Sequence, residues 1–525
     1  MNLGEYLIAL LEQYDVEAIF GIPGVHTAEM YRGLATSSIR HITPRHEQGA
    51  GFMADGYARI SGKPGVCLVI TGPGLSNIAT AMLQAKGDSI PMLVISGVNA
   101  RGDMGSGRGY LHEMPNQQAF AAQCSVFSHT ILTPDEVPSV LARAFAVFEG
   151  ARPGPVHIEI PLDLMGASTD GLPPLKRAAV AAAPVPDSLD EAVAEIDAAS
   201  APIILLGGGA KRGAADAVAL AERLDCPLVT TMSARSSVPH GHSLHVGASP
   251  GHGPVAAMID SADLVLAFGT EMGPTDYLDF DTGTEPRPQR LLRVDIDAAQ
   301  MGRRPIADIA LVGDAASVLG ALAGRVAEVK RDGAGRTAQA RAAVLNSLPQ
   351  NYTDMLGTLN ALRDAVPDAM WVGDSTQLVY TGNLAFAPGD KGAWLNSSSG
   401  FGTLGYGLPA AIGAKLADPS RPSVVLIGDG GIQFTLGELG TAMDEALPIV
   451  VVVWNNSGYG EIRSFMENRQ IKPEGVNLTP PDFTLIGRAY GFETVALDGA
   501  EALPDAVAHA VTQNKPTLIE VCGVT

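Results

Sequence analysis

Cysteine is scarce in this chain of 525 residues, with four in all and no CxxC pair. The four cysteines lie far apart, at Cys67, Cys124, Cys226 and Cys522. This spacing gives no disulfide framework and no paired-cysteine redox or metal motif. We therefore expect buried thiols and a cytoplasmic protein, because the cytoplasm keeps thiols reduced.

Positive charge and long apolar runs are also in short supply. Lys and Arg total 35 against 56 Asp and Glu, a formal net charge of −21, which argues against nucleic acid and anionic membranes as partners. No apolar run is long enough to span a bilayer, and the first residues lack the basic region of a signal peptide. The hydrophobic share of 46% indicates a globular protein, and the length suggests about three domains.

Strand and helix patterns alternate along the whole chain, as is typical of doubly wound α/β domains. We expect a first domain over residues 1–170, a central domain over 187–330 and a third domain over 351–525. A Pro- and Ala-rich linker (172–186) separates the first two, and a polar helical connector (330–350) separates the last two. The predicted fold class is therefore three parallel-sheet α/β domains.

One part of the third domain has the chemistry of a metal site. A GDG turn (428–430) and a pair of asparagines (455–456) each follow an apolar strand, and we expect a helix over 432–446 between them. A βαβ unit of this kind brings two strand ends side by side at one sheet edge. Because Mg²⁺ prefers oxygen ligands, we expect Asp429, Asn456 and a carbonyl of the following loop to hold it.

A glutamate and a glycine-rich segment supply two further features. Glu47, in the run RHEQGAGFMADGYAR, follows a strand (39–43) and opens a helix (46–61), where a carboxyl group can project from a sheet edge. The segment SGFGTLGYGLP (399–409) sets one large apolar residue, Leu404, among glycines that let the backbone approach a flat ring closely. Both features favour a site for a planar cofactor.

Together these segments resemble the thiamine diphosphate (ThDP) enzymes, most closely the acetohydroxyacid (acetolactate) synthase branch, and also 5-guanidino-2-oxopentanoate decarboxylase. The runs that carry the resemblance are FGIPG (20–24), RHEQGA (45–50), TGPG (71–74), VDIDAAQMG (294–302) and GTLGYGLPAAIGA (402–414). The resemblance implies the three-domain ThDP-enzyme fold, with ThDP and Mg²⁺ as cofactors. It also implies a homodimer or homotetramer in which the first domain of one subunit faces the third domain of another.

The resemblance further implies roles for individual residues. Glu47 would face a ring nitrogen of the cofactor's pyrimidine, the carbonyl of Gly402 would accept from its amine, and Leu404 would bend the cofactor. The implied Mg²⁺ ligands are Asp429, Asn456 and Gly458. The other implied cofactor contacts are Gly24, Gly74, Asn77, Gln377, Gly428, Gly430, Gly431, Tyr459 and Gly460.

The segments that would face the substrate depart from the biosynthetic synthases. Those enzymes carry a GTDAFQE-like run where this chain has RGYLHEM (108–114), a tryptophan where Phe465 stands, and a methionine where Glu461 stands. A carboxylate in a dry pocket disfavours an apolar keto acid anion, but Glu461, with Glu113, could bind a distal cation such as a guanidinium. His112 and Tyr110 are candidates for proton delivery, a step that suits a histidine because it titrates near neutral pH.

We therefore expect a ThDP- and Mg²⁺-dependent decarboxylase of a small 2-oxo acid, with 5-guanidino-2-oxopentanoate as a candidate substrate. Three alternatives stay open: acetolactate synthase-type joining of two 2-oxo acids, a flavin-linked 2-oxo acid oxidoreductase, and a catalytically silent ThDP-binding subunit. The segment VDID (294–297) resembles the flavin-proximal part of the synthases, but the sequence does not favour FAD. Glu47 and the intact metal motif argue against the silent subunit.

Overall fold

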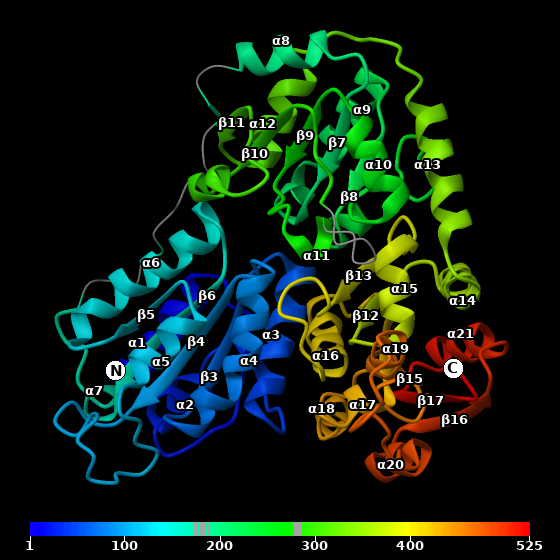
Figure 1. The fold of residues 1–525 in the computed structure, drawn as a ribbon. Coiled ribbons are helices and arrows are strands. Elements are labelled where there is room, and N and C mark those ends of the chain that lie inside the picture. The colour runs from blue at the N-terminus through cyan, green and yellow to red at the C-terminus, as the bar shows by residue number, and fades with distance from the viewer. Residues whose placement is uncertain (173–176, 178–184, 187–188, 278–284, 525) are drawn as a thin grey trace.

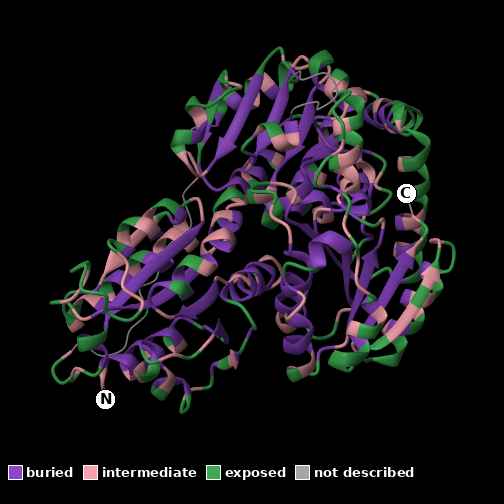
Figure 2. Ribbon diagram, turned by 60° about the horizontal axis from the view of Figure 1, so that its bottom comes forward, coloured by how far each residue is buried: buried purple, intermediate pink, exposed green. Residues whose placement is uncertain are grey.

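The computed structural model describes residues 1–524 except 173–176, 178–184, 187–188 and 278–284. It contains three parallel sheets, each flanked by helices, and the central domain lies across the other two (Figure 1). The strands of the sheets are largely buried, and the exposed residues lie mainly on the outer helices and loops (Figure 2). No helix in the described ranges is long and apolar enough to cross a bilayer. The predicted fold class is confirmed.

The sheet of the first domain has the strand order β2-β1-β3-β4-β6-β5. Its strands are β1 (Ala18–Gly21), β2 (Arg40–Ile42), β3 (Gly65–Val69), β4 (Met92–Val98), β5 (Phe127–Thr130) and β6 (Pro155–Pro161). Its helices are α1 (Leu3–Gln13), α2 (Ala28–Leu34), α3 (Glu47–Ser61), α4 (Pro73–Gly87), α5 (Gln117–Cys124), α6 (Val137–Gly150) and α7 (Leu162–Met165). Because the order reverses between β1 and β3, the loops after these strands diverge and leave a crevice suited to a ligand.

The sheet of the third domain repeats this order as β13-β12-β14-β15-β17-β16. Its strands are β12 (Met370–Gly373), β13 (Ala393–Asn396), β14 (Ser423–Gly428), β15 (Ile449–Trp454), β16 (Glu493–Asp498) and β17 (Thr517–Cys522). Its helices are α14 (Gln350–Ala365), α15 (Gln377–Ala385), α16 (Gly407–Ala417), α17 (Asp429–Ile432), α18 (Glu438–Asp444), α19 (Gly460–Asn468), α20 (Phe483–Tyr490) and α21 (Leu503–Gln513). The equivalent reversal falls between β12 and β14, beside the GDG turn.

The central domain has the strand order β11-β10-β9-β7-β8. Its strands are β7 (Ile203–Leu206), β8 (Leu228–Thr230), β9 (Val265–Phe268), β10 (Leu291–Asp295) and β11 (Ile309–Val312). Its helices are α8 (Asp190–Ala198), α9 (Ala214–Leu224), α10 (Gly253–Ser261), α11 (Pro274–Tyr277) and α12 (Ala315–Ala323), and α13 (Gly333–Ser347) leads to the third domain. The connector expected over 330–350 is thus largely helix α13. The predicted linker 172–186 lies mostly outside the described residues, and the domain bounds stay a prediction.

Helices α3 and α16 pack against each other and join the first domain to the third. A Cβ added at Gly56 would lie 2.0 Å from the carbonyl oxygen of Ala410, and one added at Gly413 would lie 1.9 Å from that of Met53. The two backbones therefore approach too closely for any larger residue at these glycines. The later residue of each helix contacts the earlier residue of the other, so the helices run antiparallel.

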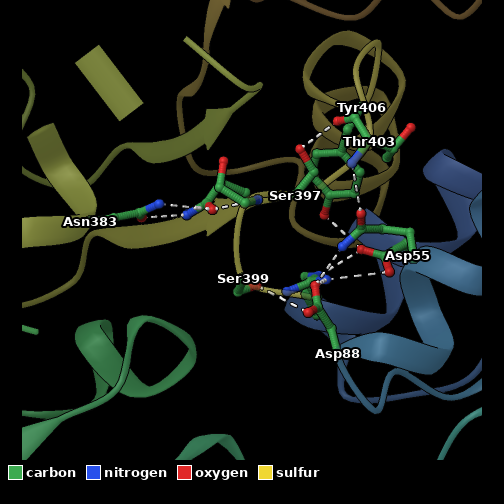
Figure 3. A network of polar contacts seen from close by, with 11 residues as sticks. Asp55, Asp88, Asn383, Ser397, Ser399, Thr403 and Tyr406 are labelled. Atoms are coloured by element: carbon green, nitrogen blue, oxygen red, sulfur yellow. Dashed lines mark hydrogen bonds and ion pairs between the residues drawn. The ribbon is translucent and has the colours of Figure 1, made fainter. Parts of the chain in front are cut away.

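A buried polar network reinforces this junction (Figure 3). The Arg59 guanidinium pairs with Asp55 (2.6 Å) and Asp88 (2.5 Å). Asp55 also accepts from the hydroxyl of Tyr406 (2.6 Å), and Asp88 accepts from that of Ser399 (3.0 Å). Ser399 begins the predicted glycine-rich segment and Tyr406 lies within it, so the network holds the segment against the first domain at two points.

The helix expected over 432–446 is present as α18 but is shorter, because residues 433–437 form turns. Helix α17 ends at Ile432 and α18 begins at Glu438. Between them the hydroxyl of Thr435 donates to the carbonyl of Gly405 (2.8 Å). This bond and the glycine at 437 favour turns over a continuous helix, and the break lets the segment contact the glycine-rich loop.

Candidate active site

Glu47 lies at the carboxyl edge of the first sheet, where it begins α3. The helix starts there because His46 caps it, accepting from the backbone N–H of Gln48 (3.1 Å). The Glu47 carboxylate is 8% exposed and accepts from the side-chain amide of Asn77 (2.9 Å). A Cβ added at Gly74 would lie 3.6 Å from its other oxygen. The structure therefore brings together three residues that the sequence places up to thirty positions apart.

The loop after β1 closes the same crevice. A Cβ added at Gly24 would lie 2.5 Å from Cγ2 of Ile70, which stands just beyond β3. The hydroxyl of Thr27 donates to the carbonyl of Gly24 (3.1 Å) and fixes the turn. Gly74 also lies against Ile70, since a Cβ there would be 2.9 Å from Cγ1 of Ile70, so the loops that carry Gly24 and Gly74 lie side by side near Glu47.

Sequence reasoning missed a carboxylate that holds the Glu47 segment in place. Glu438, at the start of α18, is 1% exposed and accepts from the backbone N–H groups of Arg45 and His46 (3.1 Å each). It also accepts from the hydroxyl of Thr441 (2.6 Å). Burial raises its pKa, while these hydrogen bonds lower it. In the sequence Glu438 is indistinguishable from an ordinary acid in the first turn of a helix.

Oxygen atoms converge where the GDG turn meets the double asparagine. The Asp429 carboxylate is 1% exposed, and its Oδ2 has no hydrogen-bond partner in the described part of the chain. Oδ1 of Asn456 lies 2.8 Å from the carbonyl oxygen of Gly458 and 3.2 Å from Oδ1 of Asp429. Burial raises the pKa of Asp429, opposed by the backbone N–H groups of Asn456 and Gly458. With the amide oxygen of Asn456 on this side, three oxygens face one another; with the amide turned over, its nitrogen donates to Gly458 and Asp429 instead.

The orientation of the Asn456 amide is explained by its other neighbours. Its nitrogen donates to Oε1 of Gln377 (3.1 Å), which also accepts from Nε1 of Trp454 (3.3 Å). Turning the amide over would place two acceptor oxygens against each other at Gln377. In an octahedral Mg²⁺ site with bonds of about 2.1 Å, adjacent ligand oxygens lie about 3 Å apart. The donor set and its spacing therefore fit a hard divalent cation.

The remaining predicted diphosphate contacts surround these oxygens. Gly458 has φ +144°, and a Cβ there would lie 2.3 Å from the carbonyl oxygen of Val476. A Cβ added at Gly430 would lie 2.7 Å from the ring of Tyr459, and one added at Gly460 would lie 2.4 Å from Nδ2 of Asn456. The described ranges contain no group of three His, Cys, Asp or Glu that could hold a metal ion, so this candidate site depends on one carboxylate and two neutral oxygens.

A second carboxylate that sequence reasoning missed shapes the glycine-rich loop. Asp374, fully buried after β12, accepts from the backbone N–H groups of Gly407 (2.9 Å) and Gly405 (3.3 Å). Burial raises its pKa to about 6. Gly402 has φ +73°, and Leu404 beside it is only half-buried. Asp374 thus anchors the turn that presents Leu404 at the sheet edge.

Within the described residues, the groups around Glu47 and around Asp429 have separate hydrogen-bond partners, and Glu438 is a third-domain side chain that bonds to the Glu47 segment. The hydrogen bonds and close contacts of Asp429 and Gly458 in the described structure all lie within the third domain. No hydrogen bond joins Glu47 to Leu404 or Asp429 across the described part of the chain.

Glu461, at the start of α19, is a partly buried carboxylate without a cationic partner. Burial raises its pKa, opposed by a hydrogen bond from the side chain of Gln377. No Lys, Arg or His forms an ion pair with it in the described ranges. Arg463 instead reaches toward the carbonyl of Ser457 (3.4 Å). Because Gln377 contacts both Glu461 and Asn456, this carboxylate lies next to the proposed metal ligands.

The other predicted substrate residues have different surroundings. Phe465, one turn along α19, is 53% exposed, and the Arg469 guanidinium stacks over its ring (4.5 Å). Glu113 accepts from the backbone N–H groups of Gly107 (2.6 Å) and Gly109 (2.8 Å), and from two further groups of its own loop. Its carboxylate therefore organises this loop and does not meet Glu461.

The fold and the site define a class, and comparison with known proteins agrees with it. Thiamine pyrophosphate enzyme models match residues 1–120 (N-terminal TPP binding domain), 189–322 (central domain) and 374–521 (C-terminal TPP binding domain). The chain belongs to the thiamine pyrophosphate enzyme family, and the resemblance found in the sequence is confirmed.

Comparison with individual relatives narrows the range of enzyme types within this family. The chain is 45% identical to the "Probable 2-ketoarginine decarboxylase AruI" of Pseudomonas aeruginosa, over 99% of this chain and 94% of that protein. It is 32% identical to the acetolactate synthase isozyme 1 large subunit of Escherichia coli, over 98% and 93%. It is 30% identical to the acetolactate synthase large subunit of Corynebacterium glutamicum, over 99% and 86%. The prediction of an enzyme of the decarboxylase or acetolactate synthase type is confirmed.

Proposed function

We propose that this protein is a ThDP- and Mg²⁺-dependent decarboxylase of a 2-oxo acid that bears a distal cation, such as 5-guanidino-2-oxopentanoate. The observation that carries the substrate class is Glu461, a half-buried carboxylate with no cation to pair with in the described structure. A guanidinium could form a charge-assisted pair with it. The similarity to a probable 2-ketoarginine decarboxylase supports the same substrate, because 2-ketoarginine is 5-guanidino-2-oxopentanoate.

The residues of the third domain would hold the cofactor through a metal ion. Asp429, Asn456 and the Gly458 carbonyl would bind Mg²⁺, and the N-terminus of α17 would face the diphosphate. The implied diphosphate contacts remain Gln377, Gly428, Gly430, Gly431, Tyr459 and Gly460. When bound, ThDP supplies a carbon nucleophile for the keto group and accepts the electron pair released as CO₂ leaves.

The residues of the first domain would orient the cofactor ring. Glu47 would hold a proton at the pyrimidine, and its burial beside Asn77 fixes the carboxyl group in one position. Leu404 and the carbonyl of Gly402 would set the bend of the cofactor from the opposite side. Gly24 and Gly74, which have no side chain, would let the cofactor ring approach the backbone closely.

We further propose a homodimer, or a homotetramer built from it, because no hydrogen bond joins Glu47 to Asp429 within the described residues. A second copy would supply the missing half of each site. The exposed apolar side chains near the proposed metal site support this assembly, since Phe434 (53%), Phe465 (53%) and Ile462 (51%) would otherwise face water. The cytoplasm suits such a protein, because its cysteines are free in the described structure.

Acetolactate synthase chemistry is the second candidate function. The observation that favours it is similarity of 30–32% along nearly the whole chain to acetolactate synthases. The same catalytic residues would serve, and the outcome would depend on whether a proton or a second keto acid reaches the reacting carbon. No observation favours the flavin-linked alternative, and we do not propose it.

The experiment that tests this function measures CO₂ and aldehyde from a panel of 2-oxo acids, with ThDP and Mg²⁺ present. The panel contains 5-guanidino-2-oxopentanoate, the uncharged 2-oxohexanoate and pyruvate. We expect 4-guanidinobutanal and CO₂ from the first acid at the highest kcat/KM. Acetolactate from pyruvate, without CO₂ release from the guanidino acid, would support the synthase instead.

A further inference from the structure

An indole, two amides and a carboxylate form one chain of hydrogen bonds at the carboxyl edge of the third sheet. Nε1 of Trp454, at the end of β15, donates to Oε1 of Gln377 (3.3 Å), and Nδ2 of Asn456 donates to the same oxygen (3.1 Å). At its other end the Gln377 amide donates to the Glu461 carboxylate. Trp454 is 4% exposed and Gln377 is 9% exposed. One buried amide therefore contacts both a proposed metal ligand and the proposed substrate carboxylate.

Trp454 determines which way the Gln377 amide faces. An indole nitrogen can only donate and an ionised carboxylate can only accept, whereas an amide presents an acceptor at one end and donors at the other. With Oε1 toward Trp454, both ends of Gln377 are matched. The reverse orientation would set N–H against N–H at Trp454 and oxygen against oxygen at Glu461. Because unmatched polar groups are costly when buried, the orientation that matches Trp454 is strongly favoured.

Asn456 is subject to a conflict that Gln377 resolves. With its amide turned over, its nitrogen would donate to the carbonyl of Gly458 (2.8 Å) and to Asp429 (3.2 Å), but its oxygen would then lie 3.1 Å from Oε1 of Gln377. In the orientation that the structure has, its oxygen joins those of Asp429 and Gly458, as a cation requires. The cation-binding orientation thus depends on an acceptor at Gln377, and the position of that acceptor depends on the indole of Trp454.

The sheet holds the indole in place. Trp454 is the last residue of β15 and pairs with Gly428 of β14 on one side and with Val521 of β17 on the other. Its side chain belongs to the same buried apolar cluster as Leu378, the residue after Gln377. A strand that is buried and paired on both sides has a fixed register. The donor therefore keeps its position relative to the GDG turn.

We propose that Trp454 is a positioning residue that sets the Mg²⁺ site and the substrate carboxylate together, by holding the Gln377 amide in one orientation. The part that concerns Glu461 rests on the proposed function, because only a cationic substrate needs that carboxylate. The part that concerns Asn456 rests on the metal site alone. Removal of one indole N–H should therefore weaken metal binding and substrate selectivity together, although Trp454 belongs to neither set of ligands.

Trp454→Phe tests this proposal, because it removes the indole N–H and keeps an aromatic ring. Trp394→Phe is the matched control, since this indole also donates to a buried amide of α15, that of Asn383 (2.8 Å). Asn383 bonds in turn to Asn396 (2.9 Å), and within the described residues neither amide bonds to a proposed metal ligand or to Glu461. Both variants lose the same kind of bond in the same domain, so a general loss of stability should affect both alike.

Two measurements are made on each variant. Calorimetric titration of Mg²⁺ into protein with saturating ThDP should show an affinity about 10-fold weaker in Trp454→Phe and unchanged in Trp394→Phe, because residues that orient metal ligands change affinity by at least this much. The second measurement is the ratio of kcat/KM for 5-guanidino-2-oxopentanoate to that for 2-oxohexanoate, at saturating Mg²⁺. This ratio should fall about 2- to 12-fold in Trp454→Phe, the effect of one neutral hydrogen bond, and should match the wild type in Trp394→Phe.

A third readout needs neither ThDP nor turnover. The chain has three tryptophans, and their indole ¹⁵N–¹H signals are assigned from Trp371→Phe and Trp394→Phe. Trp394 donates to Asn383, whereas Nε1 of Trp371 is buried and has no hydrogen-bond partner in the described part of the chain. Because a hydrogen bond shifts an indole proton downfield, Gln377→Leu should move the Trp454 signal upfield, toward that of Trp371, and leave the Trp394 signal in place.

The outcomes separate this proposal from the function on which it partly rests. Equal Mg²⁺ affinity in Trp454→Phe and Trp394→Phe would overturn the role at the metal, and equal substrate ratios would overturn the role at Glu461. A Trp454 signal that Gln377→Leu does not move would overturn both roles, and this signal decides alone should Trp454→Phe fail to fold. Absence of CO₂ from the wild type on every 2-oxo acid would instead refute the proposed function, while calorimetry and NMR would still decide the role at the metal.

Discussion

Replacing Glu461 by glutamine tests the choice of substrate, because it removes the charge and keeps the size of the side chain. Glutamine can still accept from Gln377, so the contact with the neighbour of Asn456 survives. A hydrogen bond to a charged group contributes about 1.5–3 kcal/mol. Each 1.4 kcal/mol is about tenfold in kcat/KM, so the preference for a guanidinium should fall about 10- to 150-fold.

The assay is the ratio of kcat/KM for 5-guanidino-2-oxopentanoate to that for 2-oxohexanoate, which has a similar length and no charge. Glu467→Gln is the matched control, since this residue lies on the same helix, is exposed and carries the same charge. We expect the ratio to fall in Glu461→Gln and to stay near the wild-type value in Glu467→Gln. Equal ratios in the two variants would refute the assignment of Glu461 to the substrate.

The pH dependence of this ratio follows from the same geometry. Burial raises the pKa of Glu461, so the carboxylate takes up a proton at a higher pH than an exposed glutamate does. The selectivity should therefore decline as the pH falls toward this raised pKa, and it should be constant with pH in Glu461→Gln.

Three further predictions concern catalysis and folding. Glu47→Gln should lower kcat about 100-fold or more while ThDP still binds by calorimetry, and an unchanged kcat would contradict its role. Glu438→Ala should lower the free energy of unfolding by about 1–3 kcal/mol in urea, because two buried N–H groups lose their acceptor; an unchanged urea midpoint would contradict this. Burial lowers the pKa of His157 and of His245 to about 3, so between pH 6.5 and 3 the unfolded chain binds protons that the native chain does not. The free energy of unfolding should then fall with falling pH, by up to about 1.4 kcal/mol per unit for each histidine, and a urea midpoint that rises on acidification would contradict this.

The elements that position the site were largely predictable from local sequence. Strands β7, β10, β12 and β15 are each a short apolar run that ends in a turn or a polar residue, so their bounds can be read from the sequence. The positions of Glu47 and Asp429 followed from a rule of parallel sheets, that side chains after the carboxyl ends of strands share one edge. Local sequence patterns therefore indicated at which sheet edges the candidate catalytic and metal-binding residues lie.

The residues that hold the site in place could not be predicted in this way. Glu438 contacts Arg45 across 393 positions of sequence, and Asp374 contacts Gly407 across 33. The ring of His26 packs edge to face against the ring of His112, 86 positions away in the sequence. Each of these side chains looks like an ordinary polar residue until tertiary structure buries it, because its role depends on a partner from another element. The break between α17 and α18 has the same origin, since Thr435 bonds to Gly405 from a different loop.

The central claim is that the converging oxygens of Asp429, Asn456 and Gly458 bind a divalent cation that in turn holds ThDP. Calorimetric titration of the purified protein with ThDP, in Mg²⁺ and then in EDTA, tests this claim most directly, with Asp429→Asn as the second sample. We expect binding that requires Mg²⁺ and that weakens at least about tenfold in Asp429→Asn, because even neighbours of metal ligands change affinity by this much. Equal affinity in Mg²⁺ and EDTA, or no heat with the wild type in Mg²⁺, would contradict the account.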